Sequence, residues 1–327
     1  MTTNKPLQII MMGTGPFAVP SFDALLKAGH TIQLVVTKPQ PPVKSRKGPP
    51  PEPVRDWAGE NGLPIFDPAT INDPEAVARI SGLQSDLLVV CDYGHILKPD
   101  ALAASKLGGI NLHGSLLPAY RGAAPVQRAL LSGDKVTGIT VIHMTPKLDG
   151  GPILCTRETE ITDTETAGEL EVRLSQIGVD ASIEAVEMLA TWDGESPIGQ
   201  VQDAAKVSKA PRLSKKEAQI DWNRTVREID CHVRGMQPWP IAFTHITTNP
   251  SKPPIRLAIK EVAAATDVEV GDHKSGEVVA GDGLFIAVAD GVIEIKRLQP
   301  AGKREMLAEE FLRGHKPPPG TKLQNTA

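Results

Sequence analysis

Asn111, His113 and Asp149 are residues whose types and spacing suit the transfer of an acyl group. Asn111 and His113 alternate with apolar residues over 109–113, as in a strand with one buried face, so both side chains leave its C-terminal end on the same face. An amide can donate to a carbonyl oxygen that becomes an oxyanion, and an imidazole can move protons. Asp149 precedes two glycines, which let a backbone or a ligand come close. Taken singly, the three also have ordinary structural interpretations: a strand-end cap, a packed histidine and a turn former.

The elements that must position these residues indicate an α/β, doubly wound, Rossmann-like N-terminal domain, because apolar strands alternate with helices. In such a sheet, ligands bind at the carboxyl ends of the strands, where the amide and the imidazole are expected. A strand over 153–159 and an amphipathic helix over 164–191, capped by Thr162 or Asp163, follow. The other expected strands are 8–12, 31–37, 64–66, 87–90, 109–113 and 139–144, with helices over 54–61, 74–81 and 125–132.

The glycines after the first strand match the dinucleotide-binding pattern G-x-G-x-x-A over 13–18, so an oxidoreductase has to be considered. Pro16 and Pro20 disturb the turn into the helix, and a proline lacks the N–H that would face a pyrophosphate. The second strand ends in Thr37-Lys-Pro39, with no carboxylate for a ribose. We therefore interpret the glycines as a tight turn near the ligand cleft, without a nucleotide.

The chain of 327 residues, 40% apolar and 23% charged, has a globular composition and room for two domains. No apolar run approaches the roughly 20 residues that span a bilayer, and the first residues lack a signal-peptide segment. Cys91, Cys155 and Cys231 have neither a disulfide-framework spacing nor a zinc-site spacing, which is typical of a reducing compartment. We expect a cytoplasmic protein that holds no metal and contacts no membrane.

The net charge of −4 is unevenly distributed. Residues 1–205 hold 16 basic and 24 acidic side chains, whereas residues 206–327 hold 19 basic and 15 acidic ones. The densest basic stretch, 206–260, has 11 basic and 4 acidic residues, which favours docking of a polyanion there. An ordinary solvated surface with a few extra lysines is the alternative, and charge alone does not decide between the two.

A proline-rich stretch over 38–53 interrupts the first domain. It contains a small basic cluster, Lys44, Arg46 and Lys47. A loop of this length inside an α/β domain is usually functional or solvated, and both interpretations stay open on composition alone.

A second domain is predicted at 214–327, after an N-terminal domain at 1–195 and a polar linker at 196–213. It begins with a helix near 225–236, and short strands between Gly and Asp turns then indicate a small, OB-like β-barrel. Trp239, between two prolines, is either packed in the core or available for base stacking. The expected strands are 242–247, 255–262, 276–279, 284–288 and 292–298.

Several motifs resemble the folate-dependent formyltransferases, and in particular the methionyl-tRNA formyltransferase family. Asn111-x-His113 followed by Asp149 is shared by the whole group, so it is specific for formyl chemistry but not for the acceptor. The longer block S-L-L-P…R-G-A-A-P at 115–125 is specific for the branch that acts on tRNA. L-S-K-K-E-A-Q-I-D-W, Q-P-W-P, L-Q-P-A-G-K and F-L-R-G-H resemble the tail domain of that branch. The similarity extends from residue 9 to residue 315.

The resemblance implies that 10-formyltetrahydrofolate is the co-substrate. Its formyl group would pass to the free amino group of the methionyl moiety of initiator methionyl-tRNA, for translation initiation, with no metal and no nucleotide. A monomer is expected. The implied residues are Asn111, His113 and Asp149 for catalysis; Ser115, Leu116, Leu117, Pro118, Tyr93 and Gly94 for folate; and Lys44, Arg46 and Lys47 for the tRNA acceptor end, to which the basic stretch adds Lys206, Lys209 and Arg212.

Two stretches depart from the family pattern. In the loop at 38–53, prolines and Ser45 stand where glycines are usual, so Arg46 is carried over with its register open by one residue. Before the Tyr93 turn, Cys91-Asp92 replaces the usual small apolar pair, so only the shape of that turn carries over.

Three other classes of protein can be compared with this pattern. A formyltetrahydrofolate hydrolase would share the three catalytic residues but lack the basic loop and the tail domain. A nicotinamide oxidoreductase would need a ribose carboxylate after the second strand. A non-catalytic RNA-binding protein would have no reason to keep Asn111, His113 and Asp149 together.

Overall fold

The computed structural model describes residues 6–40, 51–248, 251 and 253–324, and the chain divides into two compact units. Unit 1 consists of Met1–Pro125, Val136–Glu160 and Glu171–Pro211, and unit 2 of Val126–Lys135, Ile161–Leu170 and Arg212–Ala327. Two short segments that precede residue 171 therefore belong to unit 2. The domain boundaries expected from composition stay predictions.

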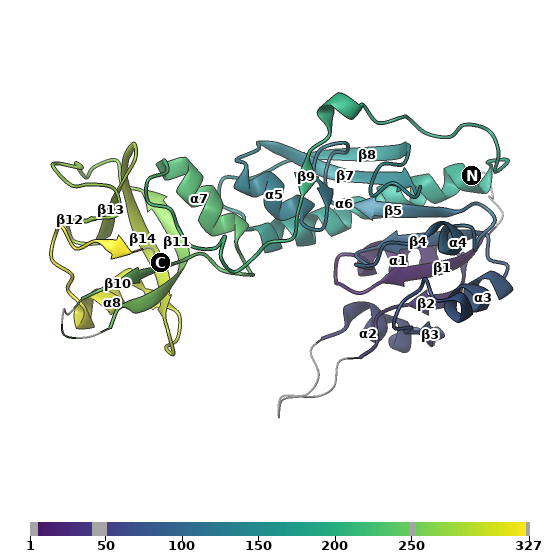
Figure 1. Ribbon diagram of the computed structural model, residues 1–327, viewed down its shortest axis with the longest axis horizontal. Helices are drawn as coiled ribbons and strands as arrows, with labels where there is room; N and C mark the ends of the chain where they lie inside the picture. Colours follow the sequence, from purple (N-terminus) through teal and green to yellow (C-terminus); the bar gives the residue numbers. More distant parts are fainter. Residues whose placement is uncertain (1–5, 41–50, 249–250, 252, 325–327) are drawn as a thin grey trace. The chain divides into compact units, whose positions relative to one another are not determined.

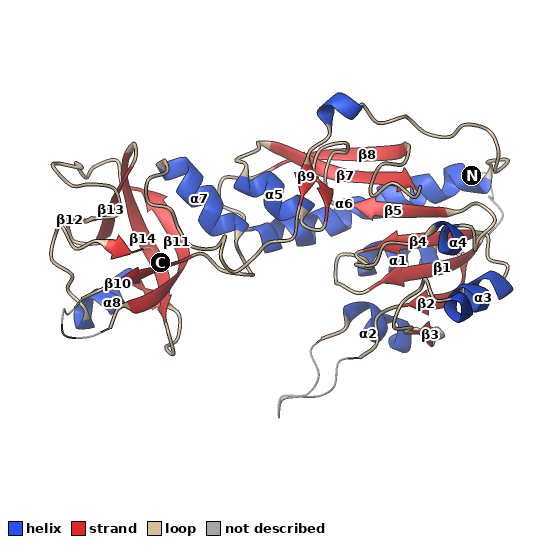
Figure 2. Ribbon diagram, viewed as in Figure 1, coloured by secondary structure: helices blue, strands red, loops and turns tan. Residues whose placement is uncertain are grey.

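Unit 1 is built on a seven-stranded sheet of order β3-β2-β1-β4-β5-β7-β8 (Figures 1 and 2). The strands from β3 to β5 in this order are parallel, whereas β7 and β8 are antiparallel to their neighbours. The winding reverses between β1 and β4, the place where doubly wound sheets open a crevice for ligands. The strands are β1 (Gln8–Gly13), β2 (Thr31–Val36), β3 (Ile65–Phe66), β4 (Leu87–Cys91), β5 (Gly109–His113), β7 (Val136–His143) and β8 (Ile153–Glu160), and the short strands β6 (Arg121–Gly122) and β9 (Lys209–Ala210) pair with each other.

Helices cover both faces of this sheet because its buried strands are apolar on both sides. On one face, Ile10 of β1 belongs to a buried cluster with Ile80 of α3 and Ala101 of α4. On the other face, Phe22 of α1 packs beside Trp57 of α2, with ring centroids 6.0 Å apart. The helices are α1 (Val19–Lys27), α2 (Pro53–Glu60), α3 (Pro74–Gly82), α4 (Pro99–Leu102) and α6 (Ala167–Ala190), with a short 3-10 helix at Ala204–Lys206.

The start of α6 differs from the sequence-based prediction. Two Thr-x-x-Glu patterns precede it, Thr162 to Glu165 and Thr166 to Glu169, and each pair exchanges side-chain-to-backbone hydrogen bonds. The helix follows the second pair and begins at Ala167. The predicted cap at Thr162 or Asp163 is therefore wrong, because the first pair closes a turn that does not continue as helix.

Unit 2 is built on an antiparallel sheet of order β12-β13-β14-β11-β10-β16, with β15 paired to β14. The first and last strands meet, because Leu323 N–H donates to the Gly276 carbonyl at 2.7 Å and Val278 N–H donates to the Thr321 carbonyl at 2.9 Å. The sheet therefore nearly closes into the small barrel that the sequence predicts. The elements are β10 (Phe243–Ile246), β11 (Ile255–Ala264), β12 (Val278–Val279), β13 (Leu284–Val288), β14 (Gly291–Pro300), β15 (Met306–Leu307), β16 (Leu323–Gln324), α5 (Pro125–Leu131), α7 (Val226–Gly235) and α8 (Ala308–Gly314).

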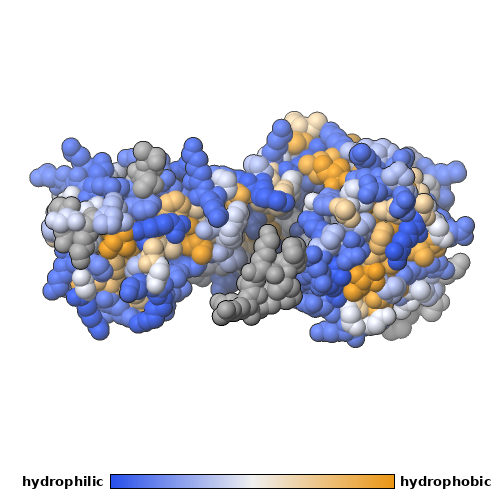
Figure 3. All heavy atoms as spheres, turned by 60° about the horizontal axis from the view of Figure 1, so that its bottom comes forward, coloured by the Kyte–Doolittle hydropathy of each residue, from blue (hydrophilic) through white to orange (hydrophobic). Residues whose placement is uncertain are grey.

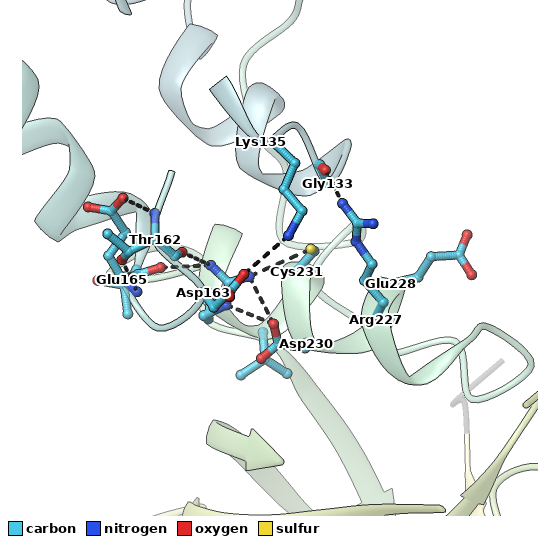
Figure 4. A network of polar contacts seen from close by, with 12 residues as sticks. Gly133, Lys135, Thr162, Asp163, Glu165, Arg227, Glu228, Asp230 and Cys231 are labelled. Atoms are coloured by element: carbon cyan, nitrogen blue, oxygen red, sulfur yellow. Dashed lines mark hydrogen bonds and ion pairs between the residues drawn. The ribbon is translucent and has the colours of Figure 1, made fainter. Parts of the chain in front are cut away.

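Polar contacts tie the two early segments of unit 2 to α7 (Figure 4). Arg227 of α7 donates to the carbonyl oxygen of Gly133 at 2.6 Å. Arg234 of the same helix donates to the carbonyl oxygen of Glu165 at 2.9 Å and pairs with Asp230 at 2.8 Å. Both arginines thus satisfy backbone oxygens that ordinary helix or strand pairing leaves open.

The described part of the chain contains no helix that is long and apolar enough to cross a membrane. Hydrophilic residues dominate the face shown in Figure 3, and apolar side chains form separate patches on it.

Candidate active site

Asn111, His113 and Asp149 meet at the carboxyl end of β5. The Asn111 Nδ2 atom donates to Asp149 Oδ1 at 3.4 Å, and His113 Nδ1 lies 3.9 Å from Asp149 Oδ2. The backbone N–H of Gly122 donates to the same Oδ2 atom at 2.9 Å. His113 is buried, and Asn111 and Asp149 are half-buried, so their polar groups are largely shielded from water. The structure thus brings together the three residues that the sequence singled out.

Local backbone geometry carries Asp149 to this point. The residue lies between β7 and β8 with a left-handed φ of 46°, a conformation that Asp adopts more readily than most residues. A Cβ atom at Gly151 would overlap the carbonyl oxygen of His143 at the end of β7. Only glycine therefore allows the turn to lie this close to the sheet.

The carbonyl of Tyr120 determines which nitrogen of His113 carries the proton. His113 Nε2 lies 2.9 Å from that oxygen, and a carbonyl can only accept a hydrogen bond, so Nε2 is the donor. A neutral ring then directs the lone pair of Nδ1 toward Asp149. Tyr120 has a φ of 61°, which is unusual for a bulky side chain and requires support from its surroundings.

The loop after β5 uses its polar groups internally. Ser115 is buried and its hydroxyl donates to the carbonyl of Ala119 at 2.7 Å. Thr140 of β7 donates to the Ser115 carbonyl at 2.7 Å and accepts from Leu117 N–H at 3.0 Å. Leu116 and Pro118 are half-buried, whereas Leu117 is buried. Of the expected folate residues in this loop, Leu116 and Pro118 thus keep some exposed surface, while Ser115 and Leu117 hold the loop's shape.

The turn after β4 lies beside the end of β5, since Val90 pairs with Asn111. Tyr93 is buried in the core cluster below, where burial raises the pKa of its phenol to about 12. Gly94 is exposed with a φ of 69°, and a Cβ there would lie 2.7 Å from the Lys38 ammonium. At Gly94 the turn therefore exposes backbone rather than a side chain.

Residues 200–211, which we call the strap, fasten both active-site loops. Its Ser208 binds the loop after β5, accepting from Tyr120 N–H at 2.8 Å through its hydroxyl and from Arg121 N–H at 2.9 Å through its carbonyl. Its Gln202 donates to the carbonyls of Asp149 at 2.8 Å and Gly151 at 2.7 Å. No signal in the sequence predicts these contacts, because a glutamine that binds backbone carbonyls leaves no pattern in a stretch of polar composition.

The expected tRNA contacts fall into two groups. Lys44, Arg46 and Lys47 lie outside the described residues. Lys206, Lys209 and Arg212 are exposed, on the strap and directly after it. Their role stays a prediction.

Comparisons with known proteins identify the family. The model of the formyl transferase family matches residues 7–186, and that of the formyl transferase C-terminal domain matches residues 212–316. A methionyl-tRNA formyltransferase from Rhodopirellula baltica is 61% identical over 325 residues, which cover 97% of this chain and 96% of that protein. The chain belongs to the methionyl-tRNA formyltransferase family. The family resemblance of the sequence motifs is thereby confirmed.

Other members of the methionyl-tRNA formyltransferase family match over similar lengths. The protein from Methylococcus capsulatus is 36% identical, over 94% of this chain and 97% of its own. The protein from Ruminiclostridium cellulolyticum is 39% identical, over 97% of this chain and 99% of its own.

Solved structures with low identity share the fold. An N-formyltransferase from Helicobacter canadensis, solved with folinic acid and dTDP-3-aminofucose, has a TM-score of 0.65 at 18% identity, over 90% of this chain and 99% of that chain. HypX from Aquifex aeolicus, solved with tetrahydrofolic acid, has a TM-score of 0.62 at 13% identity, over 94% of this chain and 47% of that chain. The α/β domain with a barrel domain, predicted for this formyltransferase from sequence, is confirmed.

Proposed function

We propose that this chain transfers the formyl group of 10-formyltetrahydrofolate to the amino group of methionine on initiator methionyl-tRNA. The observation that carries this proposal is the meeting of Asn111, His113 and Asp149 within a full-length match to methionyl-tRNA formyltransferases. The formyl group is already activated on a folate nitrogen, so the reaction requires no metal and no nucleotide.

The residues around the site fit a folate ring system. The exposed backbone of Gly94 follows β4, and the half-buried apolar side chains of Leu116 and Pro118 come from the loop after the neighbouring strand β5. Flat ligands commonly bind between such apolar walls and backbone hydrogen-bonding groups. Tyr93 contributes through the backbone of its turn, and Ser115 and Leu117 through the shape of theirs.

Asn111 stabilises the negative charge that develops on the formyl oxygen when the methionyl amine attacks the formyl carbon. Its amide nitrogen carries two hydrogens, and the one not directed at Asp149 can be donated to that oxygen. The new C–N bond forms as the bond between the formyl carbon and the folate nitrogen breaks, and the folate nitrogen takes up a proton.

His113 and Asp149 accept and stabilise the proton lost by the attacking amine. Tyr120 keeps the proton on Nε2, so Nδ1 presents its lone pair and can accept a proton. Asp149, 3.9 Å from Nδ1, stabilises the imidazolium that results and can also receive the proton through a water molecule.

The tRNA binds through the basic loop at 38–53 and through the basic stretch at 206–260, whose first residues lie on the strap. Arg46, with Lys44 and Lys47, contacts the acceptor end, and Lys206, Lys209 and Arg212 contact phosphates. Initiation of translation is the process that this product serves. A monomeric state and a cytoplasmic location stay predictions.

A reconstituted assay tests the function directly. Purified protein, 10-formyltetrahydrofolate and methionyl initiator tRNA should give formylmethionyl-tRNA in amounts stoichiometric with the tetrahydrofolate released. Release of tetrahydrofolate with formate, and no formylated tRNA, would instead identify a hydrolase.

A further inference from the structure

Gln202 lies at the centre of a compact hydrogen-bonding arrangement next to the catalytic residues. Its side-chain nitrogen donates to the carbonyl oxygens of Asp149 and Gly151, at 2.8 and 2.7 Å. Its side-chain oxygen accepts from Arg121, at 3.1 Å from Nε and 2.6 Å from one terminal nitrogen. Both hydrogens and the oxygen of this amide are therefore used, and Arg121 is itself buried.

These contacts fix the turn that carries the Asp149 carboxylate. Asp149 has a left-handed backbone, and its carbonyl and its side chain are attached to the same Cα atom, so a restraint on the carbonyl limits how far the whole residue can rotate. With the carbonyl held by Gln202, the carboxylate accepts from Gly122 N–H at 2.9 Å and reaches Asn111 at 3.4 Å. Within the turn, Gly150 N–H donates to the Lys147 carbonyl at 3.0 Å and His143 N–H donates to the Pro152 carbonyl at 2.9 Å, but neither bond engages the Asp149 carbonyl.

The strap does not depend on Gln202 for its own placement. Gln200 exchanges backbone hydrogen bonds with Ile153, at 2.7 and 2.8 Å, and Arg121 N–H donates to the Ser208 carbonyl at 2.9 Å. The strap strand β9 also pairs with β6. A contact that is redundant for holding the strap but directed at the turn of a catalytic carboxylate is suited to positioning.

We propose that Gln202 is a positioning residue for formyl transfer, which holds the Asp149 carboxylate in reach of Asn111 and His113. The proposal rests on the role proposed for Asp149. A displacement of about 1 Å at a reacting group can cost roughly 10²-fold in rate, so a contact of this kind can matter although Gln202 touches no substrate.

Three variants of the full-length protein separate positioning from folding. Gln202→Ala removes all four contacts. Gln202→Glu keeps the shape and the acceptor for Arg121 but has no hydrogen to donate, so it loses the two carbonyls of the Asp149 turn. Gln200→Ala is the matched control, because the contacts of Gln200 with Ile153 are made by its backbone.

We expect both Gln202 variants to lower kcat by roughly 10- to 10²-fold, with KM for each substrate close to that of the wild type. Gln202→Glu, which keeps the acceptor for the buried Arg121, should also keep the melting temperature of the wild type. Gln200→Ala should match the wild type. In an Asp149→Ala background, Gln202→Ala should have no further effect on kcat, because the group that it positions is already absent. Wild-type kcat in both Gln202 variants, or full additivity with Asp149→Ala, would overturn the proposal.

Amide hydrogen exchange at Gly122 tests the geometry without any turnover. Its N–H is protected by the Asp149 carboxylate, so Gln202→Ala should speed its exchange and Gln200→Ala should not. Unchanged exchange in Gln202→Ala would show that the turn is held without Gln202. Because this measurement needs no substrate, it separates a failure of this inference from a failure of the proposed reaction.

Discussion

The Nδ1 atom of His113 lies 3.9 Å from the Oδ2 atom of Asp149, beyond hydrogen-bonding distance. The bond that orients the imidazole comes from the Tyr120 carbonyl instead. The carboxylate is therefore placed to stabilise a proton that arrives on Nδ1, rather than to hold one there in the resting state.

Removal of the oxyanion donor should lower turnover while the fold is retained. Asn111→Ala should reduce kcat by about 10²–10³-fold, the usual effect of losing one such donor. Asp149→Asn, which keeps the shape but not the charge, should also lower kcat strongly. Steady-state kinetics and thermal melting check both variants. Near wild-type turnover with normal melting in either variant would contradict its proposed role.

The basic loop should act on tRNA alone. Arg46→Ala should raise KM for methionyl-tRNA with little change in folate affinity. Lys44→Ala and Lys47→Ala then show which basic residue of the loop makes the contact assigned to Arg46. The measurements are KM for tRNA and the slow hydrolysis of 10-formyltetrahydrofolate in the absence of tRNA. If Arg46→Ala abolished that hydrolysis as well, the loop would belong to the folate site.

Charges on and after the strap should contribute to the salt dependence of tRNA binding. Replacing Lys206, Lys209 and Arg212 by glutamine should reduce the slope of log K against log salt by roughly 2–3, at about 0.7–0.9 per phosphate contact. A triple variant of Lys27, Lys98 and Lys106, which are all exposed and lie in other parts of the chain, makes the same change in net charge and is the control. Equal slopes for the two triple variants would leave the basic stretch without a special role.

Glu171 should make stability depend on pH. Burial, helped by the nearby Asp92 carboxylate, raises the pKa of Glu171 from 4.5 to about 6. Folding then favours the protonated form, so the stability it gains is present below pH 4.5 and is lost as pH rises through about 6. Relative to the wild type, Glu171→Gln should therefore gain about 2 kcal/mol between pH 4.5 and 7.5. Urea unfolding at both pH values measures this, with the exposed Glu158→Gln as control; an equal effect in the control would contradict the assignment.

The three cysteines should be inert in the folded protein. All are buried, and burial raises the pKa of each thiol, that of Cys155 to about 11. At pH 8 an alkylating reagent should react roughly 10²-fold more slowly with the native protein than with the unfolded chain, which should take up three equivalents. Rapid labelling of any one thiol in the native state would show that its surroundings open.

The sequence predicts β5 well because the residue pattern that indicates a strand lies within the strand itself. The bounds of β5 agree with the expected 109–113, since alternation of apolar and polar residues marks both ends. The antiparallel course of β7 could not be predicted, because a strand's residue pattern carries no direction. The contacts of Tyr120 and Gln202 were missed for a related reason: they are made to backbone atoms, whose chemistry is the same at every residue.

In the barrel, too, some elements can be predicted from the sequence and others cannot. Its longer strands were predicted from periodicity, whereas β15 and β16 have only two residues each, too few for a pattern. The helix α8 contains the F-L-R-G motif, which indicates a family resemblance but no helix. The helix has only seven residues, too few for its apolar residues to show a helical period.

The assembly of unit 2 from distant segments has a consequence during synthesis on the ribosome. Leu130 and Leu131 pack against Gly235, and Arg227 binds the carbonyl of Gly133, so partners in this region are roughly 90 to 105 residues apart in the chain. At about 5–20 residues per second, the early segment waits roughly 5–20 s for the later one to emerge. During that interval its leucines form an apolar stretch on the nascent chain that a chaperone can bind, and slow codons before residue 226 would lengthen the exposure.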